Sequence, residues 1–144
     1  MKSIKQTLIQ KVNSSDWWHV PPKDTDAYKK RGKFLASTYT QAEFYGKPNM
    51  FPERVSISNP IFGYSETQIL KQLFPMSYKK LGASIIKMEE ADEWYKQRIY
   101  LDAKMAQKAK GLRYDAIILL PSNAKKDLLH GKKPNSIELN ILNT

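Results

Sequence analysis

The side chains of this chain that could do chemistry carry oxygen or imidazole, because its 144 residues include no cysteine and only two histidines. The lack of cysteine excludes disulfide bonds, thiolate nucleophiles and iron–sulfur clusters. His19 and His130 lie at opposite ends of the sequence, and we therefore predict no metal site. The glycines form neither G-x-G-x-x-G nor G-x-x-x-x-G-K-[ST], so nothing supports a Rossmann dinucleotide site or a P-loop.

The remaining candidates are imidazole, hydroxyl, aromatic and acidic residues near the ends of apolar runs. His19 follows two tryptophans, Ser37 and Thr38 end an apolar run, Tyr45 lies on the next helical turn, and Glu138 lies on an alternating strand. Each of these types also has an ordinary structural role, as a core-edge histidine, a helix cap, a packing ring or a solvated carboxylate. The elements that position them therefore matter.

Hydrophobic periodicity divides the first part of the chain into short elements. We predict an N-terminal helix within residues 1–13 and a strand at Trp17–Val20. A loop over residues 21–33 leads to a strand at Phe34–Thr38 and a helical turn over Thr40–Tyr45. The predicted order is strand, hydroxyl pair, short helix.

The second part of the chain alternates helices and strands. Ser65 and Gln68 have capping-box spacing at the start of a helix, and lysines 125, 126, 132 and 133 lie in a predicted basic loop. The predicted elements are a strand at Arg54–Ser58, helices at Glu66–Phe74 and Met88–Lys110, a buried strand at Tyr114–Leu120 and an alternating strand at Ser136–Leu142. In the long helix, Arg98 and Asp102 interrupt the apolar stripe and mark a polar edge.

Size and charge narrow the class of protein. One domain spanning residues 1–144 is expected from the length, and 24 Lys+Arg against 14 Asp+Glu give a net charge of +10, which favours polyanionic partners. No apolar stretch reaches the roughly 18 residues of a membrane span, and no secretory signal is recognisable. We therefore expect a cytoplasmic protein without a membrane partner, with delivery by a secretion system left open.

Taken in order, His19, Ser37 with Thr38, Tyr45, Tyr114 with Asp115, and Glu138 resemble the motifs of the ADP-ribosyltransferase fold, especially its small bacterial and phage toxins and effectors. The resemblance covers most of the chain. It implies an α+β fold in which two small, mostly antiparallel sheets and flanking helices surround a cleft for NAD, with residues 14–144 as the core. It also implies transfer of ADP-ribose from NAD to a macromolecular acceptor, protein or nucleic acid.

The resemblance assigns a role to each matching residue. Glu138 would be the catalytic carboxylate, His19 would bind the adenosine ribose, and Ser37 with Thr38 would order the site near the nicotinamide ribose. Tyr39 or Tyr45 would stack on nicotinamide. The chemistry is coherent, because cleavage of the nicotinamide–ribose bond passes through an oxocarbenium-like state that a carboxylate stabilises.

Departures from the family pattern leave alternatives open. His19 continues into Val20-Pro21-Pro22 instead of a glycine and a hydroxyl residue, and Ser136 stands two positions before Glu138, which disfavours arginine as acceptor. A protein that binds NAD without transferring from it would keep much of the same pattern. The alternative from another class is a non-catalytic basic module that binds nucleic acid. In the transferase interpretation, Lys125, Lys126, Lys132 and Lys133 would contact a polyanionic acceptor.

Overall fold

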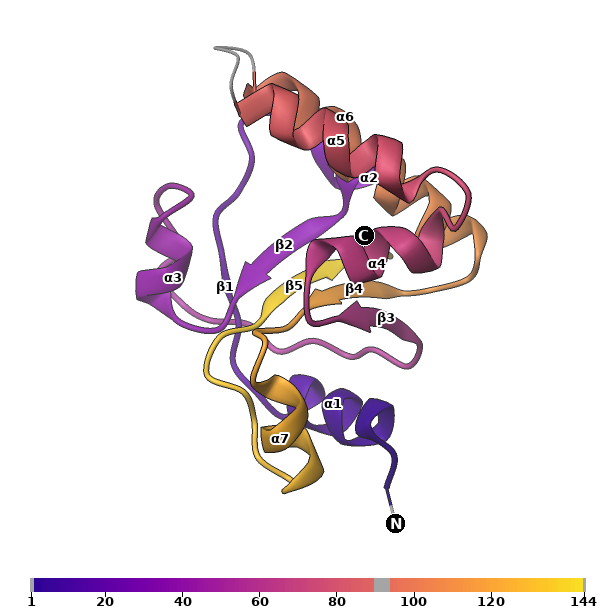
Figure 1. Cartoon of the computed structure of the whole chain (residues 1–144). Coiled ribbons are helices and arrows are strands. Elements are labelled where there is room, and N and C mark those ends of the chain that lie inside the picture. Colours follow the sequence, from indigo (N-terminus) through magenta and orange to yellow (C-terminus); the bar gives the residue numbers. More distant parts are fainter. Residues whose placement is uncertain (1, 90–93, 144) are drawn as a thin grey trace.

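A computed structural model describes residues 2–89 and 94–143 of the chain (Figure 1). Within these residues the protein has seven helices and one five-stranded open sheet. The α+β class is therefore confirmed. The expectation of two small sheets is corrected, because all five strands hydrogen-bond into one sheet in the order β1-β2-β5-β4-β3.

The elements have the following bounds. The strands are β1 (Trp18–His19), β2 (Lys33–Ala36), β3 (Pro60–Gly63), β4 (Ala116–Leu119) and β5 (Glu138–Ile141). The helices are α1 (Ile4–Asn13), α2 (Ala27–Arg31), α3 (Tyr39–Glu43), α4 (Glu66–Leu73), α5 (Tyr78–Glu89), α6 (Trp94–Gly111) and α7 (Ala124–Leu129).

The register of the strands assigns each side chain to one of two faces of the sheet. The antiparallel pairs β1–β2, β2–β5 and β5–β4 place His19 opposite Leu35, Leu35 opposite Leu139, and Leu139 opposite Ile118. Residues directly opposite each other point to the same face, and neighbours along a strand point to opposite faces. We call the face of this row the His19 face. The next row, Trp18–Ala36–Glu138–Leu119, lies on the other face, which we call the Glu138 face.

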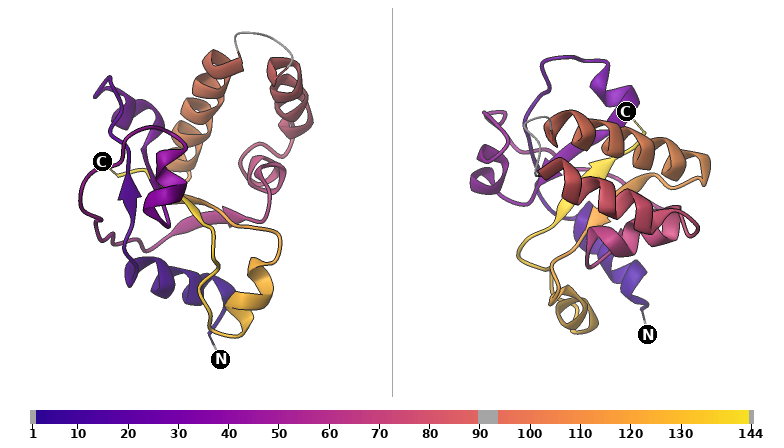
Figure 2. Two further views of the ribbon diagram at one scale, coloured as in Figure 1. Left: turned by 90° about the vertical axis from the view of Figure 1, so that its left-hand side faces the viewer. Right: turned by 45° about the horizontal axis from the view of Figure 1, so that its top comes forward.

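Each face is covered by its own helices (Figures 1 and 2). On the His19 face, Leu8 and Val12 of α1 and Leu128 of α7 pack into one core cluster with Leu139. On the Glu138 face, α4 and α6 pack against Ile61 and Ile117 in a second cluster. The sheet is therefore the middle of three layers, and β4 contributes to both cores, with Ile118 in the first and Ile117 in the second.

Several sequence predictions are confirmed. The N-terminal helix begins after Ser3, whose side chain and that of Gln6 form a capping box. Ser65 caps α4, because its hydroxyl accepts a hydrogen bond from the amide of Gln68. The strands that carry His19 and Glu138 lie within their predicted ranges.

Other predictions are wrong. Residues 54–58 form no paired strand, because the side-chain amide of Asn13 donates to the carbonyl of Ile57 and accepts from its N–H. The strand begins instead at Pro60, where pairing with β4 starts. The predicted loop over residues 21–33 contains α2, and the predicted basic loop contains α7. Both helices are so short that they leave no periodic apolar pattern.

The long predicted helix is also corrected. The structure has α5 and α6 in this part of the chain, and the predicted helical residues 90–93 lie outside the described residues. Gly111 is the last helical residue and not the cap, and the left-handed position is taken by Arg113 with φ of 70°. In the described parts of the chain, no helix combines the length and the apolar character needed to cross a membrane.

Candidate active site

Glu138 is an exposed residue at the start of β5, on a face that is otherwise largely covered by helices. The Tyr45 hydroxyl donates a hydrogen bond to Glu138 Oε1 over 3.2 Å. Burial and the negative charge of Glu138 raise the pKa of Tyr45, so the phenol stays protonated and keeps its donor role. This contact, across 93 residues of sequence, fixes one carboxylate oxygen and leaves the group at the surface.

The hydroxyl pair positions both partners of this contact. Ser37 Oγ accepts from the N–H of Ile137 at 3.1 Å and lies 3.3 Å from its carbonyl, to which it donates. These two hydrogen bonds fasten the residue that follows β2 to the residue before Glu138. Thr38 caps α3 by accepting from the amide of Gln41 at 3.1 Å, and α3 leads to Tyr45. The structure therefore gives both hydroxyls a positioning role beside Glu138.

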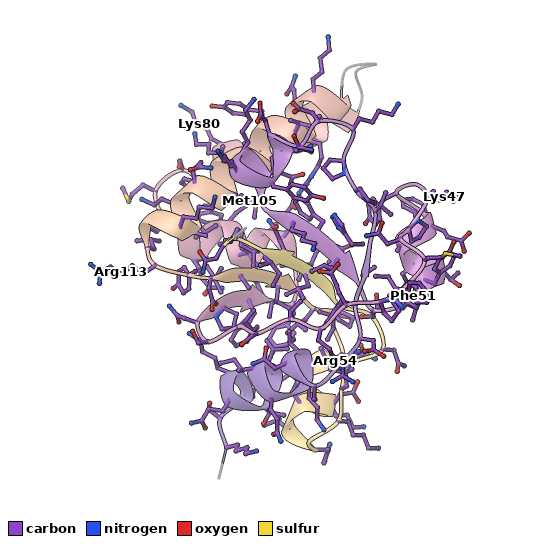
Figure 3. The ribbon with its side chains drawn as sticks, turned by 180° about the vertical axis from the view of Figure 1, so that it is seen from behind. Lys47, Phe51, Arg54, Lys80, Met105 and Arg113 are labelled. Atoms are coloured by element: carbon purple, nitrogen blue, oxygen red, sulfur yellow. The ribbon has the colours of Figure 1, made fainter. Side chains whose placement is uncertain are left out.

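Aromatic side chains lie on the same face of the sheet as Glu138. Trp18, in the row of Glu138, contacts Tyr39 edge to face with ring centroids 5.2 Å apart. Phe44 and Tyr45 make a similar contact at 5.4 Å. Beyond them the chain exposes further apolar side chains, including Phe51, which Figure 3 shows next to α3. An exposed group of rings therefore borders the carboxylate.

A pocket runs from Glu138 between the sheet and α6. Its polar and aromatic lining comes from four elements and comprises Phe34, Glu66, Arg98, Asp102, Glu138 and Asn140. Phe34 keeps 43% of its surface exposed, which is unusual for a central strand. The pocket thus combines a free aromatic face with three carboxylates and one guanidinium.

Arg98 holds two of these carboxylates in place. Its guanidinium donates to Glu66 Oε1 at 2.8 Å, makes a second bond to the other Glu66 oxygen, and donates from Nη2 to Asp102 Oδ1 at 2.8 Å. Burial acts to lower the pKa of Arg98, but its hydrogen bonds and charge contacts with Glu66 and Asp102 outweigh this and raise the pKa above its usual range. Burial raises the pKa of Asp102 although Arg98 opposes it. Arg98 is therefore a fixed cation that links α4 to α6.

Asn140 is the buried polar residue of the pocket lining. It is only 5% exposed, and its Nδ2 donates to the carbonyl of Arg31 at 2.8 Å. Gly32 lies against it with φ of 87°, and a Cβ at Gly32 would come within 2.2 Å of Asn140 Oδ1. Glycine is required here by both the backbone angle and the close approach. Asn140 thus fastens the end of α2 to β5.

His19 is not brought to Glu138. It lies on the opposite face, 4% exposed, with Nδ1 2.7 Å from the carbonyl of Phe34 and Nε2 2.9 Å from the Tyr28 hydroxyl. Burial lowers the pKa of His19, so the neutral imidazole donates through Nδ1 and accepts at Nε2. Both ring nitrogens are engaged within the protein.

The four lysines assigned to acceptor binding also lie away from Glu138. Lys125 and Lys126 belong to α7, which covers the His19 face, and Lys132 follows that helix. Lys133 Nζ lies 4.9 Å from the ring centroid of Trp17, and burial lowers the pKa of this lysine. Trp17 belongs to the core of the His19 face. The sheet therefore separates these lysines from the pocket.

Sequence reasoning missed part of the site. The i,i+4 spacing of Arg98 and Asp102 is visible as a polar interruption of a helical stripe, but nothing local to Glu66, 32 residues from Arg98, indicates that it completes the cluster. The sequence around Phe34 also gives no sign that this ring lines a pocket. Only the assembled sheet and helices bring these groups together.

Comparison of the chain with protein-family models, curated proteins and solved structures finds no match. Among the described residues, no group of three or more His, Cys, Asp or Glu side chains is arranged to hold a metal ion. The site therefore has to be judged from its own geometry: an exposed carboxylate fixed by a phenol, beside aromatic rings and above a polar pocket. Such an arrangement can stabilise a positive charge that develops on a bound sugar.

Proposed function

We propose that the protein is an NAD-dependent ADP-ribosyltransferase of the toxin, effector or phage type, with Glu138 as its catalytic carboxylate. The observation that carries the proposal is the Tyr45–Glu138 contact, because it places the terminal-strand glutamate, the helix after the hydroxyl pair and the end of β2 at one exposed point. The end of β2 and the helix are neighbours in the sequence, whereas Glu138 lies 93 residues beyond Tyr45.

In the proposed reaction NAD is a substrate. The bond between the nicotinamide nitrogen and ribose C1′ breaks, and its electron pair leaves with neutral nicotinamide. A nucleophile of the acceptor forms the new bond to C1′ and loses its proton. The carboxylate of Glu138 stabilises the positive charge that grows on the ribose and accepts hydrogen bonds from its hydroxyls.

The neighbouring residues would bind and orient. Tyr45 holds Glu138 through Oε1, and Ser37 holds the backbone before it. Tyr39 and Trp18 supply ring faces or edges on the face of Glu138, with Ala36 between Trp18 and Glu138 in the register, suited to a flat heteroaromatic group such as nicotinamide. His19 has a structural role in this proposal, since it lies on the other face with both nitrogens engaged.

The test is nicotinamide release from NAD by the full chain and by Glu138→Gln, which keeps the shape of the side chain and removes its charge. We expect the rate to fall by about 10²–10³, as for loss of one strong electrostatic contact in a transition state. Glu43→Gln is the matched control, because Glu43 is an exposed carboxylate on the nearby α3. An unchanged rate in Glu138→Gln, with Glu43→Gln also unchanged, would refute the proposal.

A further inference from the structure

The charged side chains of residues 67–83 and 96–113, on parts of α4, α5 and α6, are mostly basic. The described residues 67–83 and 96–113 contain one acid, Asp102, and that acid is bound to Arg98. Figure 3 shows Lys80 and Arg113 pointing outward on the same side of the molecule. The cations of these two ranges are Lys71, Lys79, Lys80, Lys96, Arg98, Lys104, Lys108, Lys110 and Arg113.

Aromatic rings hold several of these lysines. Lys104 Nζ and Lys108 Nζ lie 5.6 and 6.0 Å from the ring centroid of Phe74, and Lys104 Nζ is also 6.0 Å from that of Tyr100. Lys71 Nζ lies 5.8 Å from the ring centroid of Tyr78. A ring attracts an ammonium group without cancelling its charge, unlike a carboxylate. The lysines are therefore ordered while their charge stays available to a partner.

From this surface we infer a binding site for single-stranded nucleic acid, formed by Lys71, Phe74, Tyr78, Tyr100, Lys104 and Lys108, which we call the lysine–aromatic surface. Ordered cations match a chain of phosphates, Phe74 and Tyr78 pack against the core and hold the lysines, and Tyr100 offers a plane on which a base can stack. Tyr100 is 62% exposed, so one ring face is open to such contact. The alternation of charge and ring favours a single strand over a duplex, whose bases are already stacked.

The inference differs from the lysine group considered from the sequence. The lysine–aromatic surface is built on α4–α6, whereas Lys125, Lys126 and Lys132 lie on and after α7, across the sheet (Figure 1). The chain therefore has two groups of three exposed lysines with equal charge. Lys71, Lys104 and Lys108 lie among aromatic rings, and Lys125, Lys126 and Lys132 form the second group. This gives a matched control for charge alone.

The experiment measures the fluorescence anisotropy of a labelled single-stranded oligothymidine with the full chain, without NAD, over a range of salt concentrations. In the triple variant Lys71→Gln, Lys104→Gln and Lys108→Gln, we expect the Kd to rise roughly ten- to hundredfold at about 0.1 M salt, and the salt slope of binding to fall by about 2. The control triple Lys125→Gln, Lys126→Gln and Lys132→Gln should leave both close to the parent values. Melting curves check that each variant is folded.

Tyr100→Leu tests the ring itself. We expect the Kd for the single strand to rise about fivefold or more, with the salt slope unchanged, because a lost stacking contact removes no charge. Equal weakening by the two lysine triples would overturn the site, because net charge alone would then explain binding. So would unaltered binding in Tyr100→Leu, or equally tight binding of a duplex or of anionic vesicles. Since NAD is absent, these results do not depend on the proposed transferase activity.

Discussion

On the His19 face of the sheet, α1 and α7 seal the strands, and the row through Leu35, Leu139 and Ile118 is buried. On the Glu138 face, α4 and α6 cover one end, while Glu138 and Phe34 remain exposed at the other. The same strands build both faces. Neighbouring residues such as Glu138 and Leu139 therefore have different tasks, and the register, not the distance in sequence, decides which candidates can share a site.

The largest expected difference in stability is between alanine substitutions at these two neighbouring residues. Leu139→Ala removes a fully buried side chain and should lower the free energy of unfolding by about 2–5 kcal/mol. Glu138→Ala removes an exposed side chain and should change it by less than about 0.5 kcal/mol. Denaturant unfolding of both variants measures the difference. Similar losses would show that the two faces are not distinct.

A smaller loss of stability is expected when the hydroxyls of Ser37 and Thr38, which position Glu138 and Tyr45, are removed. Ser37→Ala removes the hydroxyl that both donates to and accepts from Ile137, and should cost about 1–3 kcal/mol, because a half-buried backbone N–H loses its partner. Thr38→Ala removes a helix cap and should cost about 1 kcal/mol. Chemical unfolding ranks the two. If Ser37→Ala is as stable as the parent, Ser37 does not hold the start of β5.

The smallest effect concerns pH. Burial lowers the pKa of His19, so below about pH 6.5 the unfolded chain takes up a proton more readily than the folded one, and stability should fall as the pH decreases. His19→Gln should flatten this part of the stability curve, whereas His130→Gln, at an exposed position, should leave it as in the parent. Melting temperatures between about pH 7 and pH 5 provide the readout. A parent-like pH dependence in His19→Gln would contradict the burial of this imidazole.

The sequence predicted individual helices and strands better than it predicted how they are aligned and packed. The alternation of Ser136–Leu142 correctly separates Glu138 from Leu139, and the Ser65 cap follows from local spacing. No local pattern states how β1, β2 and β5 are aligned, so the separation of His19 from Glu138 could not be predicted. The same holds for the Glu66–Arg98 contact and for the Asn13–Ile57 bonds that replace strand pairing. Such contacts depend on tertiary packing.

The most direct test of the account asks which face binds NAD. Trp18 lies in the row of Glu138, whereas the Trp17 indole is buried in the opposite core and donates to the carbonyl of Val12 at 2.9 Å. Indole N–H signals in NMR spectra, assigned with Trp18→Phe and Trp17→Phe variants, report on each face during a titration with NAD. The account predicts that the Trp18 signal shifts with saturation while the Trp17 signal stays in place. A shift of Trp17 alone, or of neither signal, would contradict it.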